Sequence, residues 1–395
     1  FGILEGKVVA QSYGHPMILL LMGGFILSTA LEHSGVHKRF ALGILSILGT
    51  ESKRLIGGFL LSSALCSMWI SNTATTLMLL PIASAIVIHK KHIAAPVLMA
   101  IAYGASIGGM ATPIGTPPNV ILMGMYKESI GKEVAFLTWM MWVLPIVITF
   151  LPLVWFWLCR GMRNEEGQEN IELETLGEWR SIEKRVVFVF ACTALLWITR
   201  KNVWGDFVPF VGDDTVALMA VIALFAIPSG EKSTSKEALL TWERAESIPW
   251  GLLLLFGGGI ALAKAFQVSG LSENIGQWLV DDIGLRSMPL WISLGILCLM
   301  VTFLTEITSN TATTTLLMPI LIAAGVSAGI DPLLWMLPAA LSASCAFMLP
   351  VATAPNAIVF ATGQLTTKQM AQTGLVLNCI GVVVISIWMQ WILPA

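Results

Sequence analysis

The chain has 395 residues, of which 56% are hydrophobic and only 12% are charged, and its formal net charge is −2. A soluble domain carries roughly twice that charged fraction, so the composition excludes a soluble globular protein and predicts an integral membrane protein. Apolar runs long enough to span a bilayer recur, which favours helices over a barrel. No basic tract suggests nucleic acid as a partner, and the six cysteines lack the spacing of a metal site.

The start of the chain predicts an extramembrane segment followed by a helix. Residues 1–15 are of mixed polarity, and the apolar run from Pro16 to Leu31 carries a Gly-Gly pair at residues 23–24. The sequence begins at Phe1 without a methionine or a polar lead-in, so we expect that an amino-terminal piece is missing.

A polar cluster, Ser-Asn-Thr-Ala-Thr-Thr at residues 71–76, lies between two apolar arms at 55–70 and 77–88. Neither arm reaches the roughly 20 residues of a full span, so we predict a re-entrant hairpin over 55–88 with its tip at membrane depth. Hydroxyl and amide groups in apolar surroundings are costly unless something binds them, and the cluster therefore indicates a ligand site. The alternative is a Ser/Thr-rich helix kink.

The next segment, 94–130, predicts a broken helix, because three prolines and a glycine interrupt it at residues 113–118. A long apolar helix follows from Ala135 to Cys159. The polar run at 160–184 then separates the chain into two halves, 1–159 and 185–395, and we expect it to be a cytoplasmic linker.

The second half repeats the order of the first at a nearly constant offset. Helices are predicted around 186–199 and 215–228, and the Gly-Gly pair then returns at 258–259. The polar cluster returns at 309–314, within a second predicted re-entrant hairpin over 289–326. Thr116-Pro117-Pro118-Asn119 returns as Thr353-Ala354-Pro355-Asn356, within a second broken helix over 333–362. We therefore predict an internal repeat, with about two helices missing from the first copy.

The distribution of basic residues predicts that the two repeats are inverted. Lysine and arginine flank the open end of the first hairpin at residues 53–54 and 90–91, whereas none occurs from 287 to 367 around the second. Because basic residues accumulate on the cytoplasmic side, the first hairpin would enter from the cytoplasm and the second from outside.

The predicted geometry brings two hairpin tips and two helix breaks together near the membrane midplane. Helix amino ends there favour anions, and free carbonyls favour small cations. Ser67 lies one helical turn before Ser71, and Thr305 one turn before Ser309, so each tip can offer the hard oxygen ligands that suit Na⁺. These stretches contain no Lys or Arg, so anion binding would depend on Asn, Thr, backbone donors and the bound cation, as a symporter requires.

At these residues the sequence resembles the divalent anion/sodium symporter family, the INDY-type dicarboxylate transporters. Both Ser-Asn-Thr tips are present, and residues 344–352, leading to Asn356-Ala357-Ile358-Val359, resemble the carboxy-terminal signature of that family. The resemblance covers essentially the whole chain.

The resemblance implies a homodimer in the inner membrane in which a scaffold, about 1–50 and 185–285, holds still. A transport domain, about 51–159 and 286–395, slides in an elevator motion with a C4-dicarboxylate and several Na⁺. It implies no catalysis and no organic cofactor. One implied sodium site consists of Ser67, Ser71, Asn72 and the Gly115 backbone, and the other of Thr305, Thr308, Asn310 and the Ala352 backbone. The implied substrate ligands are Ser71, Asn72, Thr73, Thr116, Ser309, Asn310, Thr311 and Thr353.

Several alternatives remain open from the sequence. The family also contains citrate and sulfate carriers and sodium-independent exchangers; threonine in both tips favours a carboxylate, and Ser67 and Thr305 favour sodium coupling. An ion channel could also be built from broken helices. Gly104-Ala105-Ser106-Ile107-Gly108 fits the nucleophile pattern of hydrolases, but it equally fits helix packing. Glu306 could carry a proton, aid a cation site or simply be bonded within the hairpin.

Overall fold

The computed structural model describes residues 2–88, 90–162, 176–231, 237–281 and 289–392. Within these ranges the chain is helical and has no β-strand; one isolated bridge joins Pro228 and Ala238. Six helices of the described chain are long and apolar enough to cross a membrane. The predicted all-α polytopic membrane protein is therefore confirmed.

In chain order the helices, with one 3₁₀ turn (η1) and one π-helical turn (η2), are α1 (Gly6–Tyr13), α2 (Pro16–Ser34), α3 (Val36–Leu48), α4 (Ser52–Ser67), α5 (Asn72–Val87), η1 (Lys91–Ile93), α6 (Ala94–Met110), α7 (Pro117–Ile130), α8 (Phe136–Leu158), α9 (Ser181–Thr199), η2 (Arg200–Trp204), α10 (Asp213–Ala226), α11 (Trp242–Ala245), α12 (Trp250–Val268), α13 (Leu271–Asp281), α14 (Leu290–Thr305), α15 (Asn310–Ala328), α16 (Leu333–Ala343), α17 (Ala354–Phe360) and α18 (Thr367–Ile392).

Two helical hairpins form where the polar clusters predict them. In the first, α4 ends at Ser67 and α5 begins at Asn72, and the Ser71 hydroxyl accepts a hydrogen bond from the Ala74 amide (3.2 Å) at the start of α5. In the second, α14 ends at Thr305 and α15 begins at Asn310. A serine favours the start of a helix because its hydroxyl satisfies an amide that has no partner within the helix.

The two helix breaks also occur where the prolines predict them. The first separates α6 from α7 between residues 110 and 117, and the second separates α16 from α17 between 343 and 354. Proline stands in the first turn of α7 and of α17, where its missing N–H removes no helical hydrogen bond. After each break the chain crosses to the other half, since α7 packs against α15 and α16, and α17 packs against α5 and α6.

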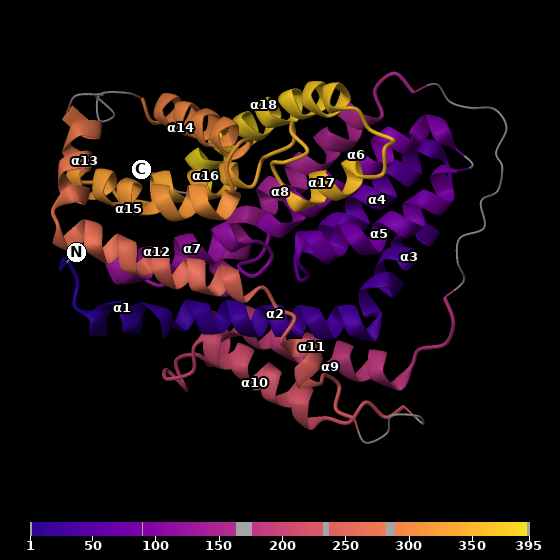
Figure 1. Cartoon of the computed structure of the whole chain (residues 1–395), viewed down its shortest axis with the longest axis horizontal. Helices are drawn as coiled ribbons and strands as arrows, with labels where there is room; N and C mark the ends of the chain where they lie inside the picture. Colours follow the sequence, from indigo (N-terminus) through magenta and orange to yellow (C-terminus); the bar gives the residue numbers. More distant parts are fainter. Residues whose placement is uncertain (1, 89, 163–175, 232–236, 282–288, 393–395) are drawn as a thin grey trace.

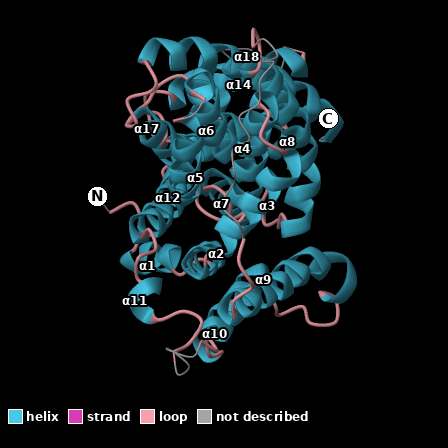
Figure 2. Cartoon of the chain, turned by 90° about the vertical axis from the view of Figure 1, so that its right-hand side faces the viewer, coloured by secondary structure: helices cyan, strands magenta, loops and turns pink. Residues whose placement is uncertain are grey.

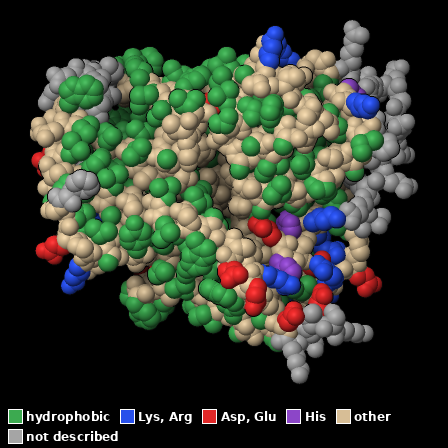
Figure 3. Space-filling model, in the orientation of Figure 1, with side chains coloured by type: hydrophobic (Ala, Val, Ile, Leu, Met, Phe, Trp, Pro, Cys, Tyr) green, Lys and Arg blue, Asp and Glu red, His purple; other side chains and the backbone are tan. Residues whose placement is uncertain are grey.

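Helices α1, α2, α9, α10 and α12 form a second layer beside these hairpins, whereas α8 and α18 pack against the hairpins and broken helices. Figures 1 and 2 place α9 and α10 at one side of the molecule and α14 and α18 at the opposite side, with α2 and α12 between them. Helix α2 packs closely on α10, since a Cβ atom on Gly23 would lie 2.7 Å from the Ala217 Cβ. Charged side chains gather at the lower right of Figure 3, where Figure 1 draws α3, α9 and α11.

Three details of the predicted organisation need correction. The start of the chain contains helix α1, which was not predicted; α1 and α2 together form one 29-residue candidate span by length and composition, Gly6–Ser34. The predicted linker, 160–184, is too long at its end, because α9 already begins at Ser181; residues 163–175 of this linker lie outside the described residues. The short helices α3 and α13, which precede the two hairpins, were not predicted.

Candidate functional site

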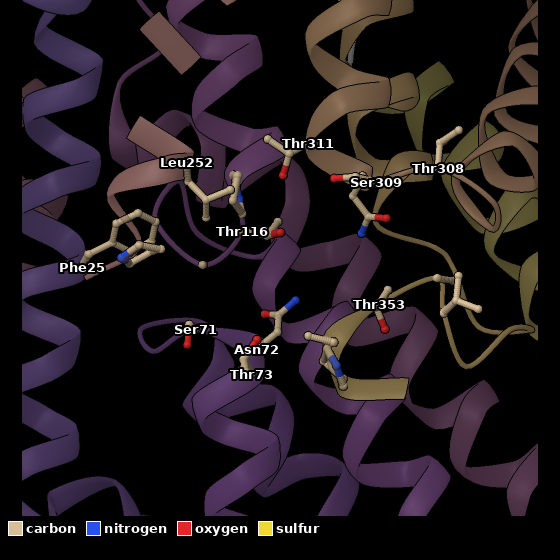
Figure 4. A pocket seen from close by; sticks show the side chains of 18 of the residues that line it. Phe25, Ser71, Asn72, Thr73, Thr116, Leu252, Thr308, Ser309, Thr311 and Thr353 are labelled. Atoms are coloured by element: carbon tan, nitrogen blue, oxygen red, sulfur yellow. The ribbon is translucent and has the colours of Figure 1, made fainter. Parts of the chain in front are cut away.

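The two hairpin tips and the two helix breaks surround one cavity of about 570 Å³ (Figure 4). This volume is in the usual range for small-molecule sites. The tips contribute residues 71–73 and 307–311, and the breaks contribute 115–117 and 351–355. Helix α2 contributes Phe25, and the start of α12 contributes residues near Leu252, so the cavity is closed on that side by the second layer.

All of the predicted substrate-binding residues line this cavity. They are Ser71, Asn72, Thr73, Thr116, Ser309, Asn310, Thr311 and Thr353. The two Ser-Asn-Thr tips, which belong to opposite halves of the sequence, therefore lie at one site. None of the described residues that line the cavity carries a formal charge, so an anion there would be held by hydroxyl, amide and backbone N–H groups.

Four helices begin at the cavity and direct their amino ends toward it. They are α5 from Asn72, α7 from Pro117, α15 from Asn310 and α17 from Ala354, and each of their first residues lines the cavity. The amino end of a helix carries partial positive charge and free N–H groups, so it favours a bound anion. The Thr353 hydroxyl caps α17 by accepting a hydrogen bond from the Asn356 amide (3.2 Å).

Beside the first tip, a hydroxyl, an amide oxygen and a carbonyl lie close together. The Ser67 hydroxyl, fully buried at the end of α4, donates to Asn72 Oδ1 at 2.5 Å. A Cβ atom placed on Gly109 would lie 2.6 Å from Asn72 Oδ1 and 3.2 Å from the Gly115 carbonyl oxygen. The small residue at 109 thus leaves room between the two oxygens. Such oxygen groups suit a hard cation such as Na⁺.

The second tip repeats the hydroxyl–asparagine pair of the first tip. The Thr305 hydroxyl, fully buried at the end of α14, lies 2.6 Å from Asn310 Oδ1 and 3.0 Å from the Ala343 carbonyl oxygen. Ser67 and Thr305 occupy equivalent positions in the two repeats, as do Asn72 and Asn310. Both hydroxyls lie behind the cavity wall, and both asparagines line the cavity, so each asparagine connects a buried hydroxyl to the ligand space.

One predicted sodium ligand is directed elsewhere. The Thr308 residue lines the cavity, but its hydroxyl lies 2.8 Å from the Leu304 carbonyl and 2.6 Å from the Thr313 hydroxyl. In Figure 4 the Thr308 side chain points away from Ser309 and Thr311. The structure therefore does not bring the Thr308 hydroxyl to Asn310.

Glu306 takes part in a network that the sequence could not specify. Its carboxylate is buried (3% exposed) and accepts hydrogen bonds from the Met348 and Leu349 amides, both at 2.9 Å, and from Asn378 Nδ2 at 2.8 Å. Charge-assisted hydrogen bonds of this kind offset the burial of a carboxylate. The geometry agrees with the view that Glu306 is bonded at the hairpin, and it adds that the bonded partner is the second helix break. Its presence as an acid inside an apolar segment was the only signal in the sequence.

The other candidate sites gain no support from the geometry. Ser106 is buried on α6, and its hydroxyl has no hydrogen-bond partner among the described residues, so no acid or histidine there activates it. The described chain contains no group of three His, Cys, Asp or Glu side chains that could hold a metal ion.

Paired hairpins and helix breaks around a neutral cavity in an apolar helical body define a multi-pass membrane transporter. Residues 1–340 match the family model described as citrate transporter, and the chain belongs to this family. The predicted resemblance to the divalent anion/sodium symporters is thereby confirmed.

The curated relatives are bacterial membrane transporters. The chain is 39% identical over 416 residues to the sodium-dependent dicarboxylate transporter SdcS of Staphylococcus saprophyticus, covering 99% of this chain and 79% of the relative. It is 38% identical over 417 residues to SdcS of Staphylococcus aureus, with the same coverage. These relatives and the apolar helices identify the chain as a multi-pass cell membrane protein.

Two solved structures share the fold at low sequence identity. The YdaH transporter of Alcanivorax borkumensis has a TM-score of 0.65 and 14% identity, covering 98% of this chain and 90% of that chain. MtrF of Neisseria gonorrhoeae, described as an antimetabolite efflux pump, has a TM-score of 0.67 and 13% identity, covering 98% and 83%. At this identity the likeness concerns the fold alone.

Proposed function

We propose that the chain is a Na⁺-coupled symporter of C4-dicarboxylates, such as succinate, malate and fumarate, in the cytoplasmic membrane. The observation that carries the proposal is the cavity between the two tips, where four helix amino ends and neutral polar side chains meet beside two hydroxyl–asparagine pairs. The names of the two Staphylococcus relatives, sodium-dependent dicarboxylate transporter, support the same substrate class.

The substrate is held by its two carboxylates. One carboxylate is bound by Asn72 and Thr73 at the first tip, and the other by Asn310 and Thr311 at the second tip, with Ser71 and Ser309 beside them. Thr353 and Thr116 complete the site from the two helix breaks. A four-carbon dicarboxylate suits a site with two similar ends, because its charged groups lie at opposite ends of a short chain.

Sodium couples to the substrate because the described residues that line the cavity include no lysine, arginine or histidine. Na⁺ binds at Ser67, Ser71, Asn72 and the Gly115 carbonyl on one side, and at Thr305, Asn310 and the Ala352 carbonyl on the other; Thr308 contributes only after its hydroxyl turns from Leu304. Opposite charges attract strongly where water is scarce, so bound Na⁺ raises the affinity for the dianion, and the dianion raises the affinity for Na⁺.

Transport follows an elevator motion of the hairpins and broken helices against the second layer. The close packing of α7 on α15 and α16, and of α17 on α5 and α6, supports movement of the site as one unit. The transport domain would comprise about 51–159 and 286–395, and the scaffold about 1–50 and 185–285, in two inverted repeats. A homodimer held through the scaffold is part of the same proposal.

Citrate is the second candidate substrate, because the matching family model is described as citrate transporter. A third carboxylate would need donors beyond the two tips, and Thr116 and Thr353 lie on the same cavity to provide them. Sodium-independent exchange is the alternative mode of transport.

Uptake by proteoliposomes tests the proposal. Labelled succinate should accumulate only with an inward Na⁺ gradient, and unlabelled succinate should compete more strongly than citrate or sulfate. Asn72→Ala and Asn310→Ala should each lower uptake by about tenfold or more, since a lost ligand is worth at least ~1.4 kcal/mol. Ser106→Ala, a buried change away from the cavity, should transport normally. Uptake that does not depend on the Na⁺ gradient would indicate exchange and contradict symport. Normal uptake by both asparagine variants would refute the assignment of the substrate site to the two tips.

A further inference from the structure

Asn119, on the first turn of α7, closes the first helix break. It is fully buried, and its side-chain amide nitrogen donates to the Thr112 carbonyl at 2.7 Å and to the Gly109 carbonyl at 3.0 Å, with the Met110 carbonyl at 3.3 Å. These carbonyls lie at and after the end of α6, where no helical N–H is available to them. One side chain thus connects the last turn of α6 with the first turn of α7.

Asn356 closes the second break in the same way. It occupies the position equivalent to Asn119 in the second repeat, is fully buried, and donates from its amide nitrogen to the Ala346 and Leu349 carbonyls, both at 3.0 Å. The same offset between the repeats relates these two acceptors to Gly109 and Thr112. The side chains of the two loops differ. The repeated feature is therefore the backbone geometry that each asparagine holds in place.

The choice of asparagine follows from its surroundings. A side chain that faces several carbonyl oxygens must donate hydrogen bonds; the amide of asparagine has two N–H donors, whereas an ionised aspartate of the same shape has none. The Oδ1 atom of each asparagine is buried without a partner among the described residues. An unpaired buried acceptor costs free energy. Because this cost occurs at both equivalent positions, we infer that the hydrogen bonds donated by the amide nitrogens offset it.

Each closed loop contains a carbonyl of a sodium site. In the first loop, Gly115 lies in the chain between Thr112, whose carbonyl accepts from Asn119, and Asn119. In the second loop, Ala352 lies between Leu349, whose carbonyl accepts from Asn356, and Asn356. Both residues line the cavity, whereas neither asparagine does. The asparagines therefore fix the path of the loops without touching the ligand space.

We propose that Asn119 and Asn356 are positioning residues, each of which holds one helix break in the shape that directs a backbone carbonyl, Gly115 or Ala352, at a transported Na⁺. This inference rests on the proposed function. Removal of such a supporting contact lowers metal affinity by about 10- to 100-fold in known sites. We expect Asn119 to act on the first sodium site and Asn356 on the second.

The test compares Asn119→Ala and Asn356→Ala with the wild type in proteoliposomes. Succinate uptake is measured over a range of Na⁺ concentrations, and the amount of folded protein is measured by size-exclusion chromatography before reconstitution. We expect each variant to need about tenfold more Na⁺ for half-maximal uptake. The maximal rate at saturating Na⁺ should fall less, because the substrate ligands of the tips remain. Ser106→Ala is the matched control, a buried polar residue on α6 without a hydrogen bond to the described chain, and it should keep the wild-type Na⁺ dependence.

Asn119→Leu and Asn356→Leu give a second pair of variants that keep the branched side-chain shape but have no donor. They should show the same loss of Na⁺ affinity as the alanine variants. A wild-type Na⁺ dependence in a folded alanine or leucine variant would overturn the inference. Loss of folded protein in both variants at one position would also overturn it, since that asparagine would then be a requirement of the fold alone. If the wild type itself shows no Na⁺-dependent uptake, the proposed function fails, which is a separate result.

Discussion

Neutral residues at the cavity can hold a doubly negative ligand because their dipoles are aligned by the helices. Each helix amino end is equivalent to roughly half a positive charge at short range, and four helices begin at this cavity. Lysine or arginine would bind the dianion without help and would remain cationic after its release. With asparagine and threonine as ligands, the negative charge of the substrate is balanced by the transported cations. The described side chains of the empty site then carry no formal charge.

Gly109 offers a direct test of the first sodium site. Substitution by alanine would place a Cβ atom 2.6 Å from Asn72 Oδ1 and 3.2 Å from the Gly115 carbonyl oxygen, closer than atoms in normal contact. We expect Gly109→Ala to raise the Na⁺ concentration for half-maximal succinate uptake by about tenfold, equivalent to ~1.4 kcal/mol. The Na⁺ dependence of uptake in proteoliposomes measures this effect.

Gly295 on α14 provides the control, because a Cβ atom there would meet nothing within 4 Å. Gly295→Ala should leave the Na⁺ dependence unchanged. An unchanged Na⁺ dependence in Gly109→Ala would show that Asn72 and Gly115 do not share a cation.

The site could be predicted in part because its residues follow local rules. The four-residue spacing of Ser67 and Ser71, and of Thr305 and Ser309, predicted one shared helical face, but α4 ends at Ser67 and α14 at Thr305, so Ser71 and Ser309 instead begin the next helices. The prediction still located the tips, because the short turns bring the Ser67 and Thr305 hydroxyls to Asn72 and Asn310. The direction of the Thr308 hydroxyl was not predictable in this way, because the carbonyl of Leu304 competes for it within the same turn. The hydrogen-bond donors to Glu306 were also not predictable, since they lie beyond the whole of α15 and α16 in the chain.

At the scale of elements, glycines control how closely α12 approaches the hairpins. A Cβ atom on Gly259 would lie 2.5 Å from Thr315 Cγ2 on α15 and 3.2 Å from Met125 Cε on α7. Thr315 cannot turn freely, because its hydroxyl donates to the Thr311 carbonyl at 2.8 Å. Overpacking such a contact costs about 1–3 kcal/mol. In the proposed elevator this contact lies between scaffold and transport domain.

We therefore expect Gly259→Ala to lower the maximal rate of succinate uptake by about tenfold, with the Na⁺ dependence unchanged, because the moving surfaces are obstructed while the ligands are intact. Gly258→Ala is the matched control on the same helix, since its Cβ would be 3.6 Å from the nearest atom, the Tyr13 hydroxyl oxygen. Equal rates for the two variants would contradict the assignment of this contact to the moving interface. Initial rates at saturating Na⁺ and succinate provide the measurement.

The helices that sequence patterns predicted are those with strong apolar runs or prolines at their ends. The break after Met110 and the start of α7 at Pro117 follow from proline chemistry, and so does the start of α17 before Pro355. Helices α3 and α13 were missed because they are short and carry polar residues on one face, so their stability depends on packing that the sequence does not display. The same applies to α1, which packs against α12.

At the scale of the whole molecule, an ion pair and a second polar contact join the two layers at one end of α7. Glu128 Oε1 lies 2.9 Å from the Lys264 ammonium on α12, and Glu128 Oε2 lies 3.5 Å from His15 Nε2, next to the start of α2. A different polar contact joins α7 to its own layer, since the Tyr126 hydroxyl donates to Asp331 Oδ2 at 2.9 Å. In an elevator motion the contacts of Glu128 with Lys264 and His15 must break during each cycle, whereas the contact between Tyr126 and Asp331 must persist.

Cross-linking separates these two contacts. In a Cys159→Ser, Cys192→Ser, Cys379→Ser background, which removes the exposed and half-buried native thiols of the described chain, a short reducible thiol cross-linker across Glu128→Cys and Lys264→Cys should stop succinate uptake. Reduction of the link should restore uptake. The same cross-linker across Tyr126→Cys and Asp331→Cys should leave uptake largely intact, because both residues move together. The two outcomes differ only if α7 moves relative to α12 during transport. Uptake that continues with α7 fully cross-linked to α12 would mean that the substrate crosses the membrane without displacement of the two layers, and the elevator would have to be abandoned for a local gating motion of the hairpin tips.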